Sequence, residues 1–184
     1  MTVDAYLRRG SSVLITTDAS PYGLGAVLQI DGKICSYLAD TFCAYDKRVL
    51  GLNEELGCTD QQALEALTIL IALREWSHFW KEVRLVLCIR TDNVAALTMV
   101  ARMQPHSAQL SIIAREMALD ISSACYTPDV VEHIPGVSNV AADCLSRLNQ
   151  PDKSVALPAY LRSVQRHFCT ERDTTWWKAQ PALP

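Results

Sequence analysis

The stretch LITTDASPYGLGAVL, from Leu14 to Leu28, decides the fold. An apolar, β-branched run leads into Asp18, a tight turn with proline and glycine follows, and a second apolar run begins at Leu24. This pattern predicts two strands joined by a short turn, the first buried on both faces because it barely alternates. An unpaired buried carboxylate is costly, so Asp18 is expected either to bind a metal ion or to cap the turn. The stretch alone leaves both interpretations open.

Hydrophobic periodicity and turn residues place the other elements. Strands are expected at 12–18, 23–30, 33–39, 83–91 and 129–134, with Asp31-Gly32 as a hairpin turn between the second and third. Helices are expected at 60–79 with Thr59 as N-cap, at 93–102, at 107–125 and at 139–147, and residues 40–58 are assigned to a loop. A hairpin followed by crossovers predicts an α/β domain with one mixed sheet. We expect a linker at 1–11, this domain at 12–148, and an irregular Pro-containing C-terminal tail at 149–184.

Composition excludes several classes of protein. Residues with hydrophobic side chains make up 49% of the 184 residues, enough for a core, but no apolar run reaches the roughly 20 residues that cross a bilayer. Seven cysteines, an odd number without a CxxC pair, favour buried thiols in a reducing compartment. We therefore expect a cytoplasmic protein that is not secreted and does not contact a membrane. The net charge of −3 means that the chain either does not bind nucleic acid or relies on a partner domain for affinity.

Three further acids occupy positions where an isolated carboxylate is awkward. Glu65 lies in the most apolar helix, Asp92 ends a strand, and Asp143 lies among small and apolar residues of a short helix. Each has a simpler interpretation. Glu65 could be a charge at a helix N-terminus, Asp92 a helix cap for which Asn93 is equally suited, and Asp143 an ordinary surface charge. Together with Asp18 they predict a cation site on separate elements. Such carboxylate sites bind Mg²⁺, and pairs of ions promote phosphodiester hydrolysis.

Four motifs in the same order, TDASPYGLGAVL, ALEALTILIALREW, IRTDNVAAL and HIPGVSNVAADCLSRL, resemble the ribonuclease H domain of reverse transcriptases, especially those of gypsy-like LTR and related retrotransposons. The resemblance covers about residues 12–148. It implies a ribonuclease H-like fold with a five-stranded mixed sheet, order 3-2-1-4-5, flanked by helices. It also implies hydrolysis of the RNA strand of RNA–DNA hybrids with two Mg²⁺ ions, for which Mn²⁺ can substitute. The implied partner is the polymerase domain of the same polyprotein.

The resemblance also assigns roles to individual residues. Asp18, Glu65, Asp92 and Asp143 correspond to the four catalytic, metal-binding carboxylates, with Asp18 shared by both ions and Asp143 on the second. His133 corresponds to a histidine that aids proton transfer or product release, although packing at a strand end is an equally good interpretation. The positions expected to contact substrate are Ser20, Tyr22, Asn93 and Asn139, and both asparagines are equally suited to capping helices.

One departure from the family pattern affects substrate binding. Many cellular relatives have a basic helical protrusion after the fourth strand's helix, whereas residues 101–111 of this chain contain one basic residue, Arg102. This agrees with the acidic net charge and with a partner that holds the hybrid. The competing hypothesis is a catalytically weak or inactive module that acts as a scaffold or binds nucleic acid within a polymerase polyprotein.

Overall fold

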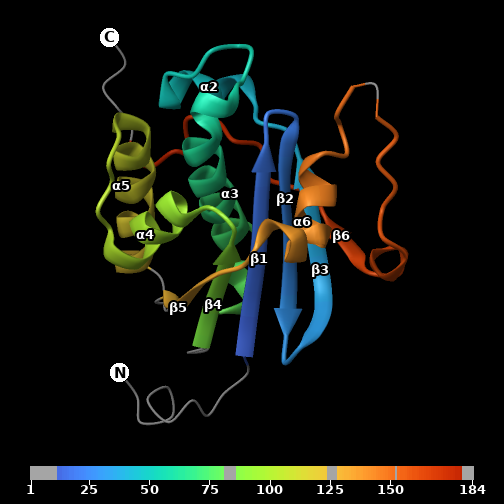
Figure 1. The fold of residues 1–184 in the computed structure, drawn as a ribbon. Coiled ribbons are helices and arrows are strands. Elements are labelled where there is room, and N and C mark those ends of the chain that lie inside the picture. Colours follow the sequence, from blue (N-terminus) through green and yellow to red (C-terminus); the bar gives the residue numbers. More distant parts are fainter. Residues whose placement is uncertain (1–11, 81–85, 124–127, 152, 180–184) are drawn as a thin grey trace.

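The computed structural model describes residues 12–80, 86–123, 128–151 and 153–179, and the predicted linker at 1–11 lies outside them. These residues form a mixed sheet with helices on both faces (Figure 1). The sheet has six strands in the order β5-β4-β1-β2-β3-β6. Their bounds are β1 Ser12–Ser20, β2 Gly23–Ile30, β3 Lys33–Asp40, β4 Val86–Thr91, β5 Pro128–His133 and β6 Gln165–His167.

The first three strands form an antiparallel meander, and the other strands pair in parallel. β1 pairs with β2 and β2 with β3 in antiparallel register, whereas β4 is parallel to β1 and to β5. The predicted hairpin turn is confirmed, because Asp31 and Gly32 lie between β2 and β3 with φ of 50° and 78°. Positive φ at both central residues is what a tight two-residue hairpin requires, and Asp-Gly adopts it at low cost.

The helices divide between the two faces of the sheet. α3 (Gln61–Glu75) packs on β1 and β2 and is flanked by α4 (Val94–Arg102) and α5 (Ala108–Ser123), while α6 (Val140–Ser146) covers the other face (Figure 1). Side chains of β2 alternate accordingly, since Leu28 joins the core under α3 whereas Val27 packs in a smaller cluster with Leu145 of α6.

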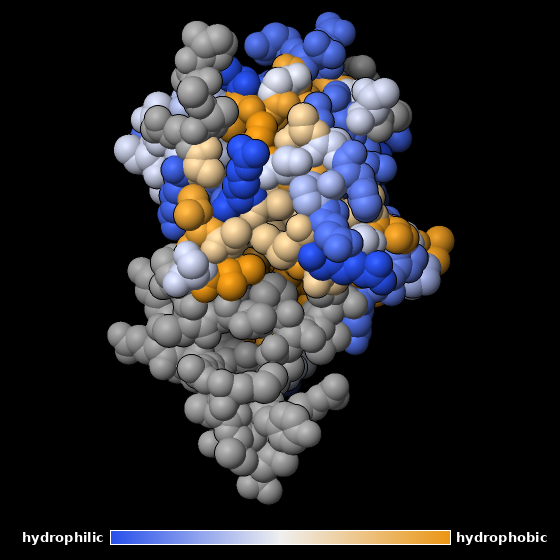
Figure 2. Space-filling model, turned by 90° about the vertical axis from the view of Figure 1, so that its left-hand side faces the viewer, coloured by the Kyte–Doolittle hydropathy of each residue, from blue (hydrophilic) through white to orange (hydrophobic). Residues whose placement is uncertain are grey.

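The outer face of α4 and α5 is rich in small and apolar side chains (Figure 2). Ala101, Ala118 and Leu119 are exposed there, and Ile112 is partly exposed. The two helices contain only two basic residues, Arg102 and Arg115. Within the described residues, none of the helices has the length and apolar character needed to span a membrane.

Two sequence-based predictions need correction at the C-terminal side of the meander. The sheet has a sixth strand, because Gln165–His167 pairs in parallel with Ser36–Leu38 of β3, so the expected five-stranded sheet and irregular tail are wrong for these residues. A strand of three polar residues has no periodic signal and forms because the edge of β3 offers partners. The second correction is α2 (Ala44–Leu50), which lies in the segment assigned to a loop. Its N-cap is Cys43, a residue type that cap rules do not favour.

The long helix also begins differently from the prediction. Thr59 was expected to cap it, but Cys58–Asp60 forms a single 3₁₀ turn and α3 begins at Gln61. Asp60 accepts a hydrogen bond from the backbone N–H of Gly57 at 2.9 Å, so its carboxylate stabilises the preceding turn. The residues after Glu75 form a second 3₁₀ turn, Ser77–Phe79, where the prediction continued the helix.

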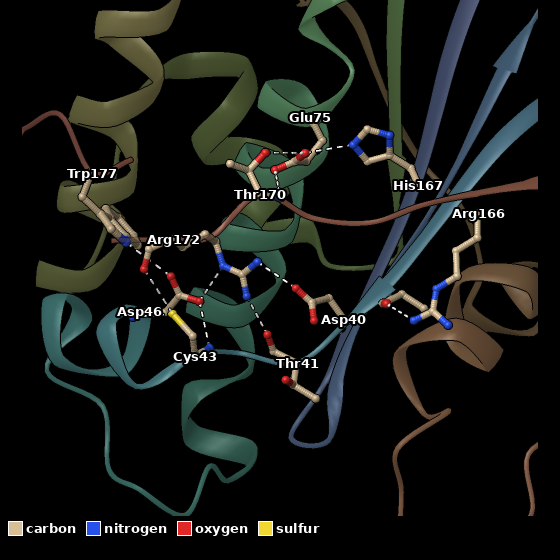
Figure 3. Close-up of polar contacts among 11 residues, drawn as sticks. Asp40, Thr41, Cys43, Asp46, Glu75, Arg166, His167, Thr170, Arg172 and Trp177 are labelled. Atoms are coloured by element: carbon tan, nitrogen blue, oxygen red, sulfur yellow. Dashed lines mark hydrogen bonds and ion pairs between the residues drawn. The ribbon is translucent and has the colours of Figure 1, made fainter. Parts of the chain in front are cut away.

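A buried ion-pair network holds the C-terminal segment against α2 and the end of β3 (Figure 3). The Arg172 guanidinium donates to Asp46 at 2.8 Å, to Asp40 at 2.9 Å and to the carbonyl oxygen of Thr41 at 2.6 Å. The indole N–H of Trp177 donates to the second oxygen of Asp46 at 3.2 Å. Asp46 therefore has partners on both oxygens, which a fully buried carboxylate requires.

A second polar cluster joins the same segment to the end of α3 (Figure 3). Glu75 accepts hydrogen bonds from the backbone N–H of Thr170 at 2.9 Å and from its hydroxyl at 3.1 Å, and its Oε2 lies 2.9 Å from His167 Nε2. The described part of residues 149–184 is thus packed on the domain through charged side chains that β3, α2 and α3 supply.

Replacing Arg172 tests this anchoring. Arg172→Ala leaves Asp46 buried without its cation, so the free energy of unfolding should fall by about 3–5 kcal/mol, measured by urea denaturation. Arg90→Ala is a matched control, because Arg90 and Glu132 form an ion pair of 2.6 Å with side chains 38% and 44% exposed. That substitution should cost about 1 kcal/mol or less. Equal, small losses in both variants would contradict the anchoring role.

Candidate metal and catalytic site

Strand register brings two of the predicted acids together. Thr16 of β1 pairs with Arg90 of the parallel strand β4, and two residues further along the chain in each case are Asp18, within β1, and Asp92, directly after β4. Glu65 reaches the same point from the second turn of α3. One carboxylate oxygen from each of Asp18, Glu65 and Asp92 lies within 4.8 Å of the others. This three-acid group lies at the carboxyl ends of parallel strands, where active sites of α/β sheets are found.

Glu65 is held in a nearly closed environment. Its side chain is 2% exposed, and its two oxygens accept hydrogen bonds from Gln61 Nε2 at 3.0 Å and Thr91 Oγ1 at 3.3 Å. Burial, followed by repulsion from Asp18, raises the pKa of Glu65 to about 8. Two neutral donors do not offset the cost of burying a charge beside another carboxylate.

Asp18 is fixed mainly by α6. The Ser146 hydroxyl donates to its Oδ2 at 2.5 Å, and the Asn139 amide donates to its Oδ1 at 3.4 Å and to the Thr17 carbonyl oxygen at 2.9 Å. Burial raises the pKa of Asp18 to about 7, against the opposing effect of the Ser146 hydrogen bond. The negative charges of Asp143 and Asp92 raise it further.

Asp143 lies nearby but is not part of the three-acid group. Its carboxylate accepts a hydrogen bond from Arg147 Nε at 2.6 Å, and the two side chains are 45% and 42% exposed. Its effect on the pKa of Asp18 shows that the two carboxylates interact electrostatically. Asp143 therefore lies on α6 close enough to act on Asp18, and it is paired with Arg147, the residue that follows this helix.

His133 and Asn139 lie beside these acids. The ring of His133 is exposed, and its Nε2 lies 3.1 Å from the carbonyl oxygen of Asp92. Asn139 is 1% exposed and makes no side-chain cap for α6, so the capping interpretation is not supported for this residue. Its amide instead links the start of α6 to Asp18.

The three other candidates for substrate contact differ in whether their side chains are exposed or already hydrogen-bonded within the protein. The buried Ser20 hydroxyl donates to the Ser146 carbonyl oxygen at 2.8 Å and accepts from the Tyr22 N–H at 3.2 Å, so it joins the β1–β2 turn to α6. Asn93 caps α4 by accepting from the Ala96 N–H at 3.0 Å, as the alternative interpretation proposed. Tyr22 is 37% exposed, so its ring is accessible.

Several residues that support the acids were not singled out from the sequence. Ser146 and Gln61 donate to Asp18 and Glu65, and Thr91 donates to Glu65. Helical spacing offered a signal for Gln61, since it precedes Glu65 by four residues. Gly136 was also missed, and a Cβ there would lie 2.9 Å from Asp92 Oδ2.

The donor set fits a hard divalent cation. Only carboxylate oxygens form the three-acid group, and Mg²⁺ and Mn²⁺ prefer oxygen ligands over nitrogen or sulfur. The raised pKa values of Asp18 and Glu65 indicate that the described protein groups supply too little positive charge for three ionised acids. A bound cation would supply that charge.

Comparisons with known proteins agree with the observed topology. RNase H1 from the halophilic archaeon Halobacterium salinarum matches with a TM-score of 0.57 and 16% identity, covering 77% of this chain and 99% of that one. LC11-RNase H1, isolated from compost and solved with an RNA/DNA hybrid, matches with a TM-score of 0.53 and 18% identity, covering 73% and 93%. The N-terminal RNase H domain of a Mycobacterium tuberculosis protein, solved as a maltose-binding-protein fusion, gives 0.52 and 13%, covering 73% and 95%.

No family model and no curated protein sequence matches the chain. The structural likenesses establish a ribonuclease H-like α/β fold, with β6 as the sixth strand of its sheet. At these identities they do not by themselves assign an activity.

The pKa values predict how stability depends on pH without metal. The raised pKa values let Asp18 and Glu65 keep protons in the folded state up to pH about 7 and 8, whereas the unfolded chain loses them near the ordinary pKa values of 3.8 and 4.5. In that window the folded state binds more protons, so the free energy of unfolding falls as pH rises, by at most about 1.4 kcal/mol per pH unit per group. Urea denaturation in EDTA from pH 5 to 8.5 measures this slope.

Two variants test whether the pH dependence of stability comes from the site or from other carboxylates. Asp18→Asn removes one of the titrating groups and its repulsion of Glu65, so the slope should become shallower. Glu54→Gln removes a carboxylate whose side chain is 89% exposed and should leave the slope as in the wild type. A flat wild-type profile, or an unchanged slope in Asp18→Asn, would contradict the inferred pKa values.

Proposed function

We propose that this protein is a Mg²⁺-dependent ribonuclease H that hydrolyses the RNA strand of RNA–DNA hybrids. The observation that supports this function most strongly is the three-acid group at the carboxyl ends of β1 and β4 in a ribonuclease H-like fold. A solved neighbour with the same fold is in complex with an RNA/DNA hybrid, which makes a hybrid the first substrate to test.

The four carboxylates have distinct roles in this proposal. Glu65 and Asp92 would hold one cation together with Asp18, and Asp143 would hold a second together with Asp18, with Mn²⁺ able to replace Mg²⁺. When bound, the ions supply an activated water and stabilise charge on the leaving 3′ oxygen of the RNA. Asp18 is suited to both positions because it lies between α3 and α6, and hydrogen bonds to both of its oxygens fix its orientation.

Groups around the acids would position substrate and move protons. The exposed His133 ring beside the backbone of Asp92 is placed for proton transfer or product release. Tyr22 is accessible for contact with the hybrid, and Asn139 acts through its hydrogen bond to Asp18. For Ser20 and Asn93, whose side chains already bond within the protein, the proposed contribution to substrate binding is to shape the backbone near the site.

We further propose that the domain works beside the polymerase domain of a retroelement reverse transcriptase in the cytoplasm. The motif resemblance and two properties of the surface support this context. The chain carries a net charge of −3, and the outer face of α4 and α5 is rich in small and apolar side chains (Figure 2), with Arg102 and Arg115 as the two basic residues of these helices. Nucleic-acid affinity comes largely from basic contacts to phosphates, so a partner domain would supply most of it.

A substrate panel tests the activity. The 184-residue chain should cleave the labelled RNA strand of a hybrid with Mg²⁺ and leave duplex DNA, duplex RNA and single-stranded RNA intact. Asp18→Asn should lower the rate by about a hundredfold or more, because it removes the shared charged ligand. Glu54→Gln should cleave like the wild type.

Three outcomes would contradict this assignment. Equal cleavage by wild type and Asp18→Asn would exclude Asp18 from catalysis. Hybrid binding without cleavage at millimolar Mg²⁺ would favour the scaffold hypothesis. Cleavage of duplex DNA in place of the hybrid would indicate another nuclease of the same fold.

Ser146 provides a separate test of how Asp18 is held. Ser146→Ala removes the hydroxyl that donates to Asp18 but leaves the backbone carbonyl that accepts from Ser20. Losing such an outer support should weaken cation affinity about 10- to 100-fold, measured by calorimetric titration with Mn²⁺. Ser122→Ala, which removes an exposed hydroxyl on α5, should bind Mn²⁺ like the wild type. Equal affinities in all three proteins would show that Ser146 does not position Asp18.

A further inference from the structure

The end of α6 brings an acidic and a basic side chain together, Asp143 within the helix and Arg147 directly after it. Asp143 and Arg147 are four residues apart, and Arg147 Nε donates to Asp143 Oδ1 at 2.6 Å. This places a guanidinium group against the one predicted metal ligand that is outside the three-acid group.

The guanidinium interacts with more than its neighbour on the helix. Asp143 and Asp18 both raise the pKa of Arg147, and Arg147 in turn lowers the pKa of Asp18. Arg147 therefore compensates part of the negative charge of the site. A divalent cation held by Asp143 and Asp18 would compensate the same charge, and the two cations would repel each other at short range.

The ion pair between Arg147 and Asp143 is weak enough for another cation to take the place of Arg147. Both side chains are nearly half exposed, and exposed ion pairs in water contribute little because solvent screens them. The hydrogen-bonded Arg172–Asp46 pair, with side chains 3% and 1% exposed, is by contrast locked in the protein. Asp143 can thus be released without disturbing the core.

We propose that Arg147 competes with the second divalent cation for Asp143, so that the two cation sites fill in sequence. The site formed by Asp18, Glu65 and Asp92 fills first, and Asp143 becomes a ligand only when Arg147 is displaced. This inference rests on the proposed function, because it needs Asp143 to be a metal ligand. It adds a role for a residue outside the four carboxylates: Arg147 sets the affinity of the second site.

Calorimetric titration of the whole chain with Mn²⁺ measures both sites. The wild type should bind one ion more tightly than the other. Arg147→Gln should strengthen the weaker site about tenfold and leave the tighter site within about twofold, because Arg147 contacts Asp143 directly, whereas among the ligands of the tighter site it acts on Asp18 without a hydrogen bond to it. Arg147→Lys keeps the charge and should resemble the wild type. Asp143→Asn should abolish the weaker site.

Arg90→Gln is the matched control for these variants. Arg90 and Glu132 form an ion pair of the same 2.6 Å length with 38% and 44% exposed side chains, and Glu132 is outside the three-acid group. This variant should bind Mn²⁺ as the wild type does. Thermal unfolding in EDTA checks that each variant folds, and Arg147→Met serves as a second neutral variant.

The outcomes separate this inference from the proposed function. A strengthened weaker site in Arg147→Gln, or a second site seen only in that variant, supports the competition. Unchanged binding of two ions in Arg147→Gln and Arg147→Met overturns it and leaves the metal-dependent function standing. No Mn²⁺ binding by the wild type or any variant at millimolar metal contradicts the proposed function itself, and the competition with it.

Discussion

The structure depends on one unfavourable contact, the approach of the buried carboxylates of Asp18 and Glu65. Loss of water raises the pKa of Asp18 to about 7 and that of Glu65 to about 8, and the pKa of Glu65 is raised further by repulsion from Asp18. The fold tolerates this contact because Gln61 and Thr91 donate to Glu65, and Ser146 donates to Asp18. These neutral donors orient the acids but do not neutralise them, which leaves a site whose missing component is positive charge.

The position of α6 follows from the need to hold the buried carboxylate of Asp18. A Cβ at Gly25 would lie 2.4 Å from the Ala142 carbonyl oxygen, so glycine allows the helix to approach β2 closely enough for Ser146 to reach Asp18. The helix delivers Asp143 and its counterion Arg147 along with that hydroxyl. This short helix and the residue after it therefore hold the buried Asp18 through Ser146 and pair the more exposed Asp143 with Arg147.

The sequence predicted the parts of this structure that depend on local pattern. Local pattern predicted the Asp-Gly hairpin, the buried run that ends in Asp18 and the strand that ends before Asp92. These strands pair in the observed sheet and bring the two acids together. β6 and α2 were missed because they form through long-range partners: β6 pairs with the edge of β3, and α2 is anchored by Arg172 through Asp46. The support that Ser146 gives to Asp18 spans 128 residues, a distance that no spacing rule covers.

The central claim is that the three-acid group binds a divalent cation. Anomalous diffraction from crystals soaked in Mn²⁺ tests it most directly, because the ion is located independently of activity. The account predicts an anomalous peak coordinated by the carboxylates of Asp18, Glu65 and Asp92. Crystals that hold Mn²⁺ elsewhere, or that leave these carboxylates without a peak at millimolar Mn²⁺, would contradict it.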